Sequence, residues 1–290
     1  MDQSAIIEPI LILSGVCVVF GALIALAHSR FRVFEDPRID AASELLPGTN
    51  CGACGSPGCR AFAEGLVAGE QQPANCTVMG PDGIEDIAQL LGVAAGETNR
   101  RLARLLCAGG QDVAVQAAEY RGFASCKAAA SVAGGGKGCT WGCLGLADCE
   151  LACDLDAIHM GYGQLPIVTP ERCTACGDCV DACPKDLFVL MPVEHHLIVQ
   201  CKSELEGEEA EGVCEVACNG CGKCALDAPE GLIDMVDGLA VIDYTKHELE
   251  NSDATKRCPT GAIAWVESAQ LENRVRASEA DVSETAGRGG

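Results

Sequence analysis

The residues that most clearly indicate chemistry form one run of four cysteines followed directly by Pro184: Cys173, Cys176, Cys179 and Cys183. This C-x2-C-x2-C-x3-C-P spacing is typical of proteins with two [4Fe–4S] clusters, in which three thiolates bind one cluster and the fourth binds a second. Paired C-x2-C is also a zinc spacing, but zinc sites rarely use four cysteines packed this closely and followed by proline. The run therefore predicts iron–sulfur clusters.

A second group of four cysteines lies nearer the amino end: Cys51, Cys54, Cys59 and Cys76. Four thiolates make a complete ligand set for one [4Fe–4S] cluster. Glycines between the first three let the backbone turn tightly and bring N–H groups to the sulfurs, and such donors raise the reduction potential. A zinc site with four thiolate ligands is the alternative for this group taken alone.

An internal repeat contains most of the remaining cysteines. A shift of 75 residues superimposes 126–190 on 201–265 without a gap, so that Cys126 falls on Cys201 and Cys139 on Cys214. A repeat of this kind indicates two structural units in series. We expect two ferredoxin-like modules, each a compact α+β unit with short hairpins.

Crossed ligation, in which one ligand comes from a distant stretch, assigns the cysteines of the first module. Cys153 completes one set with Cys173, Cys176 and Cys179. The reciprocal set has Leu146 at its usual middle position, and leucine cannot bind iron. Cys139 stands four residues before Cys143 and can fill that gap. The predicted reciprocal set is therefore Cys139, Cys143, Cys149 and Cys183.

The second module retains one cluster and loses the other. Its lost cluster has non-ligating residues at all four ligand positions: Ala228, Glu248, Asn251 and Ala254. Its other set is intact: Cys218, Cys221, Cys224 and Cys258. Random loss would rarely remove one complete ligand set and spare the other, so this pattern supports crossed ligation.

Sixteen cysteines thus predict four [4Fe–4S] clusters. Five cysteines are left over: Cys17, Cys107, Cys126, Cys201 and Cys214. Buried small residues or spare thiols are one interpretation. The last four could instead hold a fifth cluster, but we favour the first interpretation because Cys126 and Cys201 are repeat equivalents on separate modules.

Composition agrees with a fold held by metal clusters. Aromatic residues make up only 4% of the chain and there are 34 glycines, so the hydrophobic core must be small. Metal binding can supply the missing folding free energy. A secreted, disulfide-stapled protein is the alternative. The net charge of −22, with no basic patch, argues against nucleic-acid binding.

The elements that position the ligands begin with an apolar stretch. Residues 10–27 carry no charge, which suits one transmembrane helix of about 20 residues. His28, Arg30 and Arg32 follow it, so the positive-inside rule places the bulk of the chain in the cytoplasm. A cleaved signal peptide ending at 25–27 is the alternative, but the first nine residues lack the Lys or Arg that a signal needs.

The expected organisation is of the α+β class. Helices are expected at 60–68 and from Pro81, where a capping-box pattern precedes a stop at Gly92. The expected parts are an anchor at 1–32, a four-Cys domain at 33–95, a connector at 96–125, modules at 126–195 and 196–266, and a disordered tail at 267–290.

Three segments together resemble the B subunit of the Rnf electron transport complex: 50–59, 139–146 and 153–158. The resemblance covers about residues 5 to 265, and the chain departs from the family in the vacant cluster position of its second module. The resemblance implies a component of an ion-translocating ferredoxin:NAD+ oxidoreductase in the cytoplasmic membrane. It also implies partners, namely the other complex subunits and soluble ferredoxin as electron donor.

No catalytic residue is expected, because the chain has neither a G-x-G-x-x-G loop nor a nucleophile elbow and its five histidines form no motif. We expect electrons to hop through neighbouring clusters, with Trp141 shielding one of them from water. The alternatives are an electron-transfer subunit of another membrane enzyme, such as a hydrogenase or formate dehydrogenase, and a zinc-binding scaffold. The sequence does not decide whether Na+ or H+ is translocated.

Overall fold

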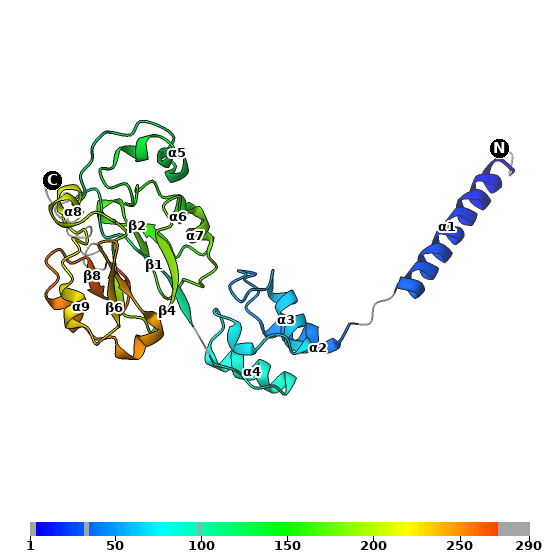
Figure 1. Cartoon of the computed structure of the whole chain (residues 1–290). Helices are drawn as coiled ribbons and strands as arrows, with labels where there is room; N and C mark the ends of the chain where they lie inside the picture. Colours follow the sequence, from blue (N-terminus) through cyan, green and yellow to red (C-terminus); the bar gives the residue numbers. More distant parts are fainter. Residues whose placement is uncertain (1–3, 32–34, 98–99, 272–290) are drawn as a thin grey trace, which may run out of the picture.

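The computed structural model describes residues 4–31, 35–97 and 100–271. The chain begins with helix α1 (Ser4–Phe31), which stands apart from the rest of the molecule (Figure 1). At 1.5 Å per residue, 28 residues give a helix about 42 Å long, more than a bilayer core of about 30 Å requires. Residues 13–31 are long and apolar enough to cross a membrane and are not covered by other parts of the chain. The predicted single apolar helix is therefore present.

Short helices build the next unit: α2 (Pro37–Leu45), α3 (Cys59–Ala68), the 3-10 turn η1 (Pro73–Asn75) and α4 (Pro81–Leu91). The side chain of Asp36 caps α2 by accepting the Arg38 N–H at 2.9 Å. Helices α3 and α4 end at left-handed glycines, and Gly92 is the predicted stop. The predicted capping box does not form, because Gly80 occupies the N-cap of α4. Phe62, Leu66 and Ile87 make the small core of this unit.

The next unit has two pairs of strands: an outer pair formed by its first and last strands in sequence, and a hairpin formed by the two strands between them. The outer pair is β1 (Arg101–Leu105) with β4 (Phe188–Pro192), antiparallel, and the hairpin is β2 (Ile158–Met160) with β3 (Pro166–Val168). Around them lie α5 (Cys126–Ala130), η2 (Ala133–Gly136), α6 (Asp148–Leu151), η3 (Tyr162–Gln164) and α7 (Asp178–Ala182). Every element is short, so the loops carry much of the structure.

The same arrangement follows a second time along the chain. The outer pair is β5 (Leu197–Val199) with β8 (Ile263–Trp265), and the hairpin is β6 (Ile233–Val236) with β7 (Leu239–Ile242). The helical segments are α8 (Gly207–Val213), α9 (Lys223–Asp227), η4 (Tyr244–Leu249) and α10 (Asp253–Lys256). Each arrangement has its own buried core, and the two pack side by side (Figure 1).

Two boundaries differ from those expected. The predicted connector 96–125 contains β1, which pairs with β4 of the module expected at 126–195. The predicted disordered tail begins with an ordered stretch, because Gln270 is 4% exposed and exchanges two hydrogen bonds with the backbone of Leu105 at 2.9 and 2.6 Å. These bonds satisfy backbone groups of β1, which holds 268–271 in place. The rest of the expected tail, 272–290, lies outside the described residues.

Candidate iron–sulfur centres

The first candidate centre, site A, lies in the unit of α2, α3 and α4. A cavity of about 300 Å³ is lined by Cys51, Cys54, Cys59 and Cys76. The side chain of Asn50 accepts the N–H of Cys59 at 2.8 Å, which ties the cysteine loop to the start of α3. Gly52 and Gly55 adopt left-handed φ values of 72° and 84°, so the loop can turn sharply between the first cysteines.

Site B lies between the helices α6 and α7. A cavity of about 320 Å³ is lined by Cys153, Cys173, Cys176 and Cys179. Backbone N–H groups point at two of the sulfurs, from Ala157 to Cys153 at 3.4 Å and from Ala103 to Cys173 at 3.5 Å. Burial, followed by the neighbouring thiolates, raises the pKa of Cys179 to about 12.

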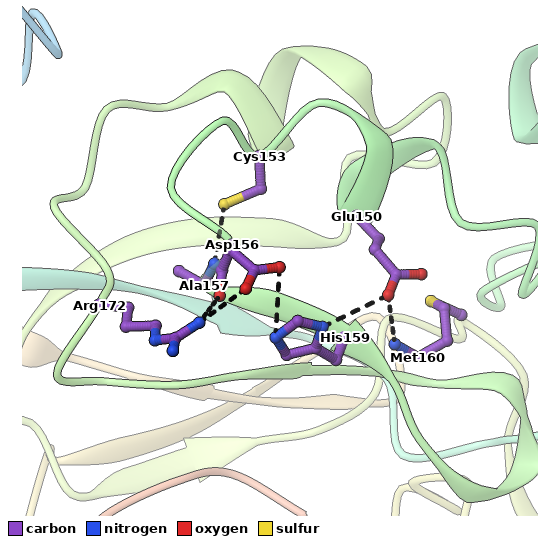
Figure 2. A network of polar contacts seen from close by, with 7 residues as sticks. All are labelled: Glu150, Cys153, Asp156, Ala157, His159, Met160 and Arg172. Carbon is purple, nitrogen blue, oxygen red and sulfur yellow. Dashed lines mark hydrogen bonds and ion pairs between the residues drawn. The ribbon is translucent and has the colours of Figure 1, made fainter.

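A network of polar contacts holds the two chain segments of site B together (Figure 2). Arg172, next to Cys173, donates to the carboxylate of Asp156 at 2.7 Å and to its backbone carbonyl at 3.1 Å. His159 lies between Asp156 and Glu150, at 3.7 and 3.6 Å. The network therefore joins the loop of Cys153 to the loop of Cys173. No sequence motif indicated this role for His159.

Site E lies in the second arrangement of strands. A cavity of about 330 Å³ is lined by Cys218, Cys221, Cys224 and Cys258. Burial raises the pKa of Cys258, but hydrogen bonds from the backbone of Ile263 and from Thr260 outweigh it and lower the pKa overall. The position of the lost second cluster is filled by protein, because Ala254 is 1% exposed and packs in the core with Ala228.

The fourth predicted set is divided between two places. Cys149 packs in one hydrophobic core with Cys143 and Cys183, and burial, followed by the thiolates of Cys143, Cys126 and Cys183, raises its pKa. We call these four cysteines site C. Cys139 instead lines a separate cavity of about 330 Å³, called site D, with Cys107, Cys201 and Cys214. The predicted grouping of Cys139 with Cys143, Cys149 and Cys183 stays a prediction, and the structure places Cys139 on the lining of a different cavity.

The reason for this division is local backbone pairing. Gly138 donates its N–H to the carbonyl of Val115 at 2.8 Å, which fixes the segment before Cys139 against residues that the sequence assigned to the connector. Cys143 lies beyond the turn at 139–142 and packs in the core that contains Cys149 and Cys183. A spacing rule cannot detect this, because the connector carries no ligand pattern of its own.

The cysteine geometry suits a cluster better than a single ion. None of the 21 cysteines, all within the described residues, forms a disulfide. In the described ranges, no three His, Cys, Asp or Glu side chains are close enough to hold one metal ion. Zinc would draw four sulfurs to about 2.3 Å from one point. Each of the four cavities at sites A, B, D and E is instead lined by four thiols, which are the donor set of a [4Fe–4S] cube.

Comparison with known families and proteins agrees with this chemistry. Residues 46–78 match a family model described as "Putative Fe-S cluster", and residues 166–188 match one described as "4Fe-4S binding domain". The chain is 38% identical to the B subunit of the Na(+)-translocating ferredoxin:NAD(+) oxidoreductase complex of Acetobacterium woodii, over 90% of this chain and 78% of that protein. The proton-translocating counterpart of Clostridium ljungdahlii is 36% identical, over 90% of this chain and 93% of that protein. The chain belongs to the family of Rnf complex B subunits.

Another family member, the B subunit of the ion-translocating oxidoreductase complex of Methanosarcina acetivorans, is 36% identical over 84% of this chain and 92% of that protein. Each of the three matches extends over at least 84% of the chain, so no single cysteine-rich unit accounts for the similarity. This Rnf protein is therefore an iron–sulfur electron-transfer subunit, and its apolar helix associates it with the membrane.

In this Rnf protein the ligand loops of sites A and B touch. Thr77, next to Cys76 of site A, donates its hydroxyl to the backbone carbonyl of Thr174, next to Cys173 of site B, at 2.8 Å. Sites B and C share helices α6 and α7. Helix α6 carries Cys149 of site C and is followed by Cys153 of site B, and α7 carries Cys179 of site B and is followed by Cys183 of site C. These contacts place the three sites in series.

Proposed function

We propose that the chain accepts electrons from reduced ferredoxin and passes them toward NAD+ reduction, coupled to Na+ or H+ translocation by the other subunits of an Rnf-type complex. The observation that carries the proposal is the series of four-cysteine sites whose ligand loops touch one another. The names of the relatives support the substrates, because they specify ferredoxin and NAD(+).

The bound groups are [4Fe–4S] clusters. When bound, they supply one-electron oxidation and reduction at each site. At least four clusters, at sites A, B, C and E, use fifteen of the sixteen cysteines predicted from the sequence. The modules proposed to hold sites B to E are the two similar strand arrangements. The protein's own part is to fix the thiolates, to donate N–H groups to their sulfurs and to exclude water.

The chain is proposed to face the cytoplasm. His28 and Arg30 lie in the last turn of α1, on the side from which the cysteine-rich units continue. Positive residues next to a membrane span remain on the cytoplasmic side. Soluble ferredoxin and NAD+ can then reach the complex from the same compartment as this subunit.

Replacing one predicted ligand tests the proposal. Cys176→Ser removes a thiolate from site B, and we expect the anaerobically purified protein to lose about 4 iron atoms and one cluster signal. Electron passage from ferredoxin should slow in the assembled complex. Cys17→Ser, in α1, is the matched control and should leave iron and sulfide unchanged. Unchanged iron in Cys176→Ser, or zinc without acid-labile sulfide, would contradict the proposal.

A further inference from the structure

Site D is a ring of four cysteines that the sequence assigned to no common cluster. Its cavity of about 330 Å³ has the same size as those of sites A, B and E, at 300–330 Å³. Three of its thiols are nearly covered, with 6–9% of each residue exposed: Cys107, Cys139 and Cys214. A cavity of the same size with the same four donors suits the same occupant.

We propose that site D holds a fifth [4Fe–4S] cluster, and that Cys126 is the fourth ligand of the cluster at site C. The inference rests on the proposed function, because it assumes that the chain carries clusters of this type. It assigns 20 of the 21 cysteines to five sets of four and leaves only Cys17, in the apolar helix α1.

One extended segment brings the ligands of site D together. Residues 113–115 pair with 213–215, through N–H···O bonds from Val115 to Val213 and from Glu215 to Val113, both at 3.0 Å. On its other side the segment accepts the Gly138 N–H at Val115. The segment thus lies between the stretch that carries Cys214 and the stretch that carries Cys139. The site therefore depends on residues 113–115, which belong to the stretch 96–125 that was expected to be a connector.

The other two ligands of site D, Cys107 and Cys201, occupy equivalent positions in the two strand arrangements. Cys107 lies two residues after β1, and Cys201 lies two residues after β5. The two stretches are joined by the bond from the Ala108 N–H to the carbonyl of Gln200, at 3.0 Å. Cys107, and not Cys126, is therefore the structural counterpart of Cys201. The site lies at the junction of the two strand arrangements.

Two features at site D fit a negatively charged occupant that needs close packing. A Cβ added to Gly109 would lie 2.7 Å from the sulfur of Cys214, so glycine is required there. Lys137 is 9% exposed and donates to the carbonyls of Gly109 at 2.5 Å and Cys143 at 2.6 Å. A buried ammonium group is costly unless it is compensated. The net negative charge of a cluster with four thiolates would compensate it.

Cys126 is held beside site C by an independent contact. The carboxylate of Asp148 accepts hydrogen bonds from the Ser125 hydroxyl and the Lys127 N–H, both at 3.0 Å. Asp148 begins α6 and directly precedes Cys149. These hydrogen bonds from Asp148 therefore hold Cys126 near Cys149, a member of the set that Cys139 was expected to join.

Site D also connects its neighbours. The N–H of Cys143, at site C, lies 3.5 Å from the sulfur of Cys107. On the other side, Ala217 lines the cavity of site D and the next residue, Cys218, lines that of site E. With site D occupied, the sites form an unbroken order A–B–C–D–E. Without it, site E would be separated from the others by an unused ring of thiols.

Metal analysis of the full chain tests the inference without any substitution. Five clusters require about 20 iron atoms with equal acid-labile sulfide, whereas four require about 16. A value near 20 supports site D. A value near 16 overturns the inference but leaves the proposed function intact, and the absence of iron and sulfide overturns both.

Paired substitutions test the grouping. Cys139→Ala and Cys214→Ala should each remove about 4 iron atoms, and the double variant should also remove about 4, because both residues serve one cluster. Cys139→Ala with Cys149→Ala should remove about 8. Cys126→Ala with Cys149→Ala should remove only about 4. The reverse pattern, in which Cys139 and Cys149 share one loss and Cys126→Ala loses nothing, would overturn the grouping. Cys17→Ala is the control.

A potential measurement distinguishes a cluster at site D from a merely structural ring of thiols. Lys137→Met removes the buried positive charge, so the reduction potential of the signal lost in Cys214→Ala should fall while iron content stays the same. Lys202→Met, on the lining of the same cavity but more exposed, is the matched control. An unchanged potential in Lys137→Met would contradict the assignment of that signal to site D.

Discussion

At the scale of single residues, Arg104 shows how the chain places charge beside its thiolates. It is 1% exposed, and the residue before it donates a backbone N–H to the sulfur of Cys173. Its guanidinium donates to the carbonyl of Ser268 at 2.9 Å, while its Nε has no hydrogen-bond partner. Burial lowers its pKa and the Cys173 thiolate acts in the opposite direction. Because a buried cation near Cys173 favours negative charge there, Arg104 is expected to raise the reduction potential of the cluster at site B.

We predict that Arg104→Leu lowers the reduction potential of the site B cluster by tens of millivolts. Two charges on the order of 8 Å apart interact by about 2 kcal/mol at an effective dielectric constant of 20, and roughly 1.4 kcal/mol corresponds to 59 mV for one electron. A redox titration of the cluster spectra measures the shift. Arg101→Leu, an exposed change on the same strand, should leave the potential unaltered. Equal shifts in the two variants would exclude a local charge effect.

The cysteines show how far the sequence can predict the sites. Sites A, B and E follow from spacing, because most of their ligands lie within one short run and the repeat identifies the distant ligand. Site D draws its ligands from four separate stretches, so no spacing rule groups them. Leu146 indicates that one ligand of the reciprocal set has been replaced. The sequence favours Cys139 as the substitute because it lies closer to Cys143 along the chain, whereas the ligand that we propose is Cys126, held by Asp148.

At the scale of elements, strands of three to five residues and helices of four to seven residues build sites B to E. Such elements bury little surface on their own and depend on the loops that bear the ligands. The sequence predicted the apolar helix, α3 and the repeated unit. It did not predict β1, because β1 lies more than 20 residues before Cys126, where the repeat in sequence begins. Its pairing with β4 is set by tertiary packing.

The bond between Thr77 and Thr174 is the element-scale link between sites A and B. We predict that Thr77→Val leaves iron content unchanged but slows reduction of site B through site A, because the bond that holds the two ligand loops together is lost. A neutral hydrogen bond contributes about 1 kcal/mol, so the loops should separate more often without unfolding. Rapid-mixing reduction kinetics would measure this rate.

A matched control for that variant is Thr245→Val, which removes a hydroxyl hydrogen bond to the carboxylate of Asp243 at 2.6 Å in the second strand arrangement, far along the chain from sites A and B. Its transfer rate should equal that of the unmodified protein. If Thr77→Val transferred electrons at the same rate as Thr245→Val, the contact would be structural only.

At the scale of the whole molecule, thiols are part of the hydrophobic cores. Cys218 and Cys224 lie in one core, and Cys149 and Cys179 lie in another. The total stability of a folded protein is only about 5–15 kcal/mol, and metal binding can supply part of it. These small cores are therefore expected to depend on the groups that their thiols bind.

We predict that removing iron with a chelator under anaerobic conditions abolishes the cooperative thermal transition of residues 100–271, while α1 remains helical in detergent. Far-ultraviolet circular dichroism and differential scanning calorimetry would measure the two effects. Reconstitution with iron and sulfide should restore the transition. A chelated protein that kept its transition temperature would show that the cores suffice without clusters.

The contact of Gln270 with β1 has a consequence for how this protein is made. The backbone N–H and carbonyl of Leu105, in β1, are both paired with the side chain of Gln270, 165 residues later in the chain. During synthesis these two bonds can form only after residue 270 has left the ribosome, long after β1 and β4 are made. The first arrangement therefore receives these bonds only after its thiols and the apolar helix have been synthesised.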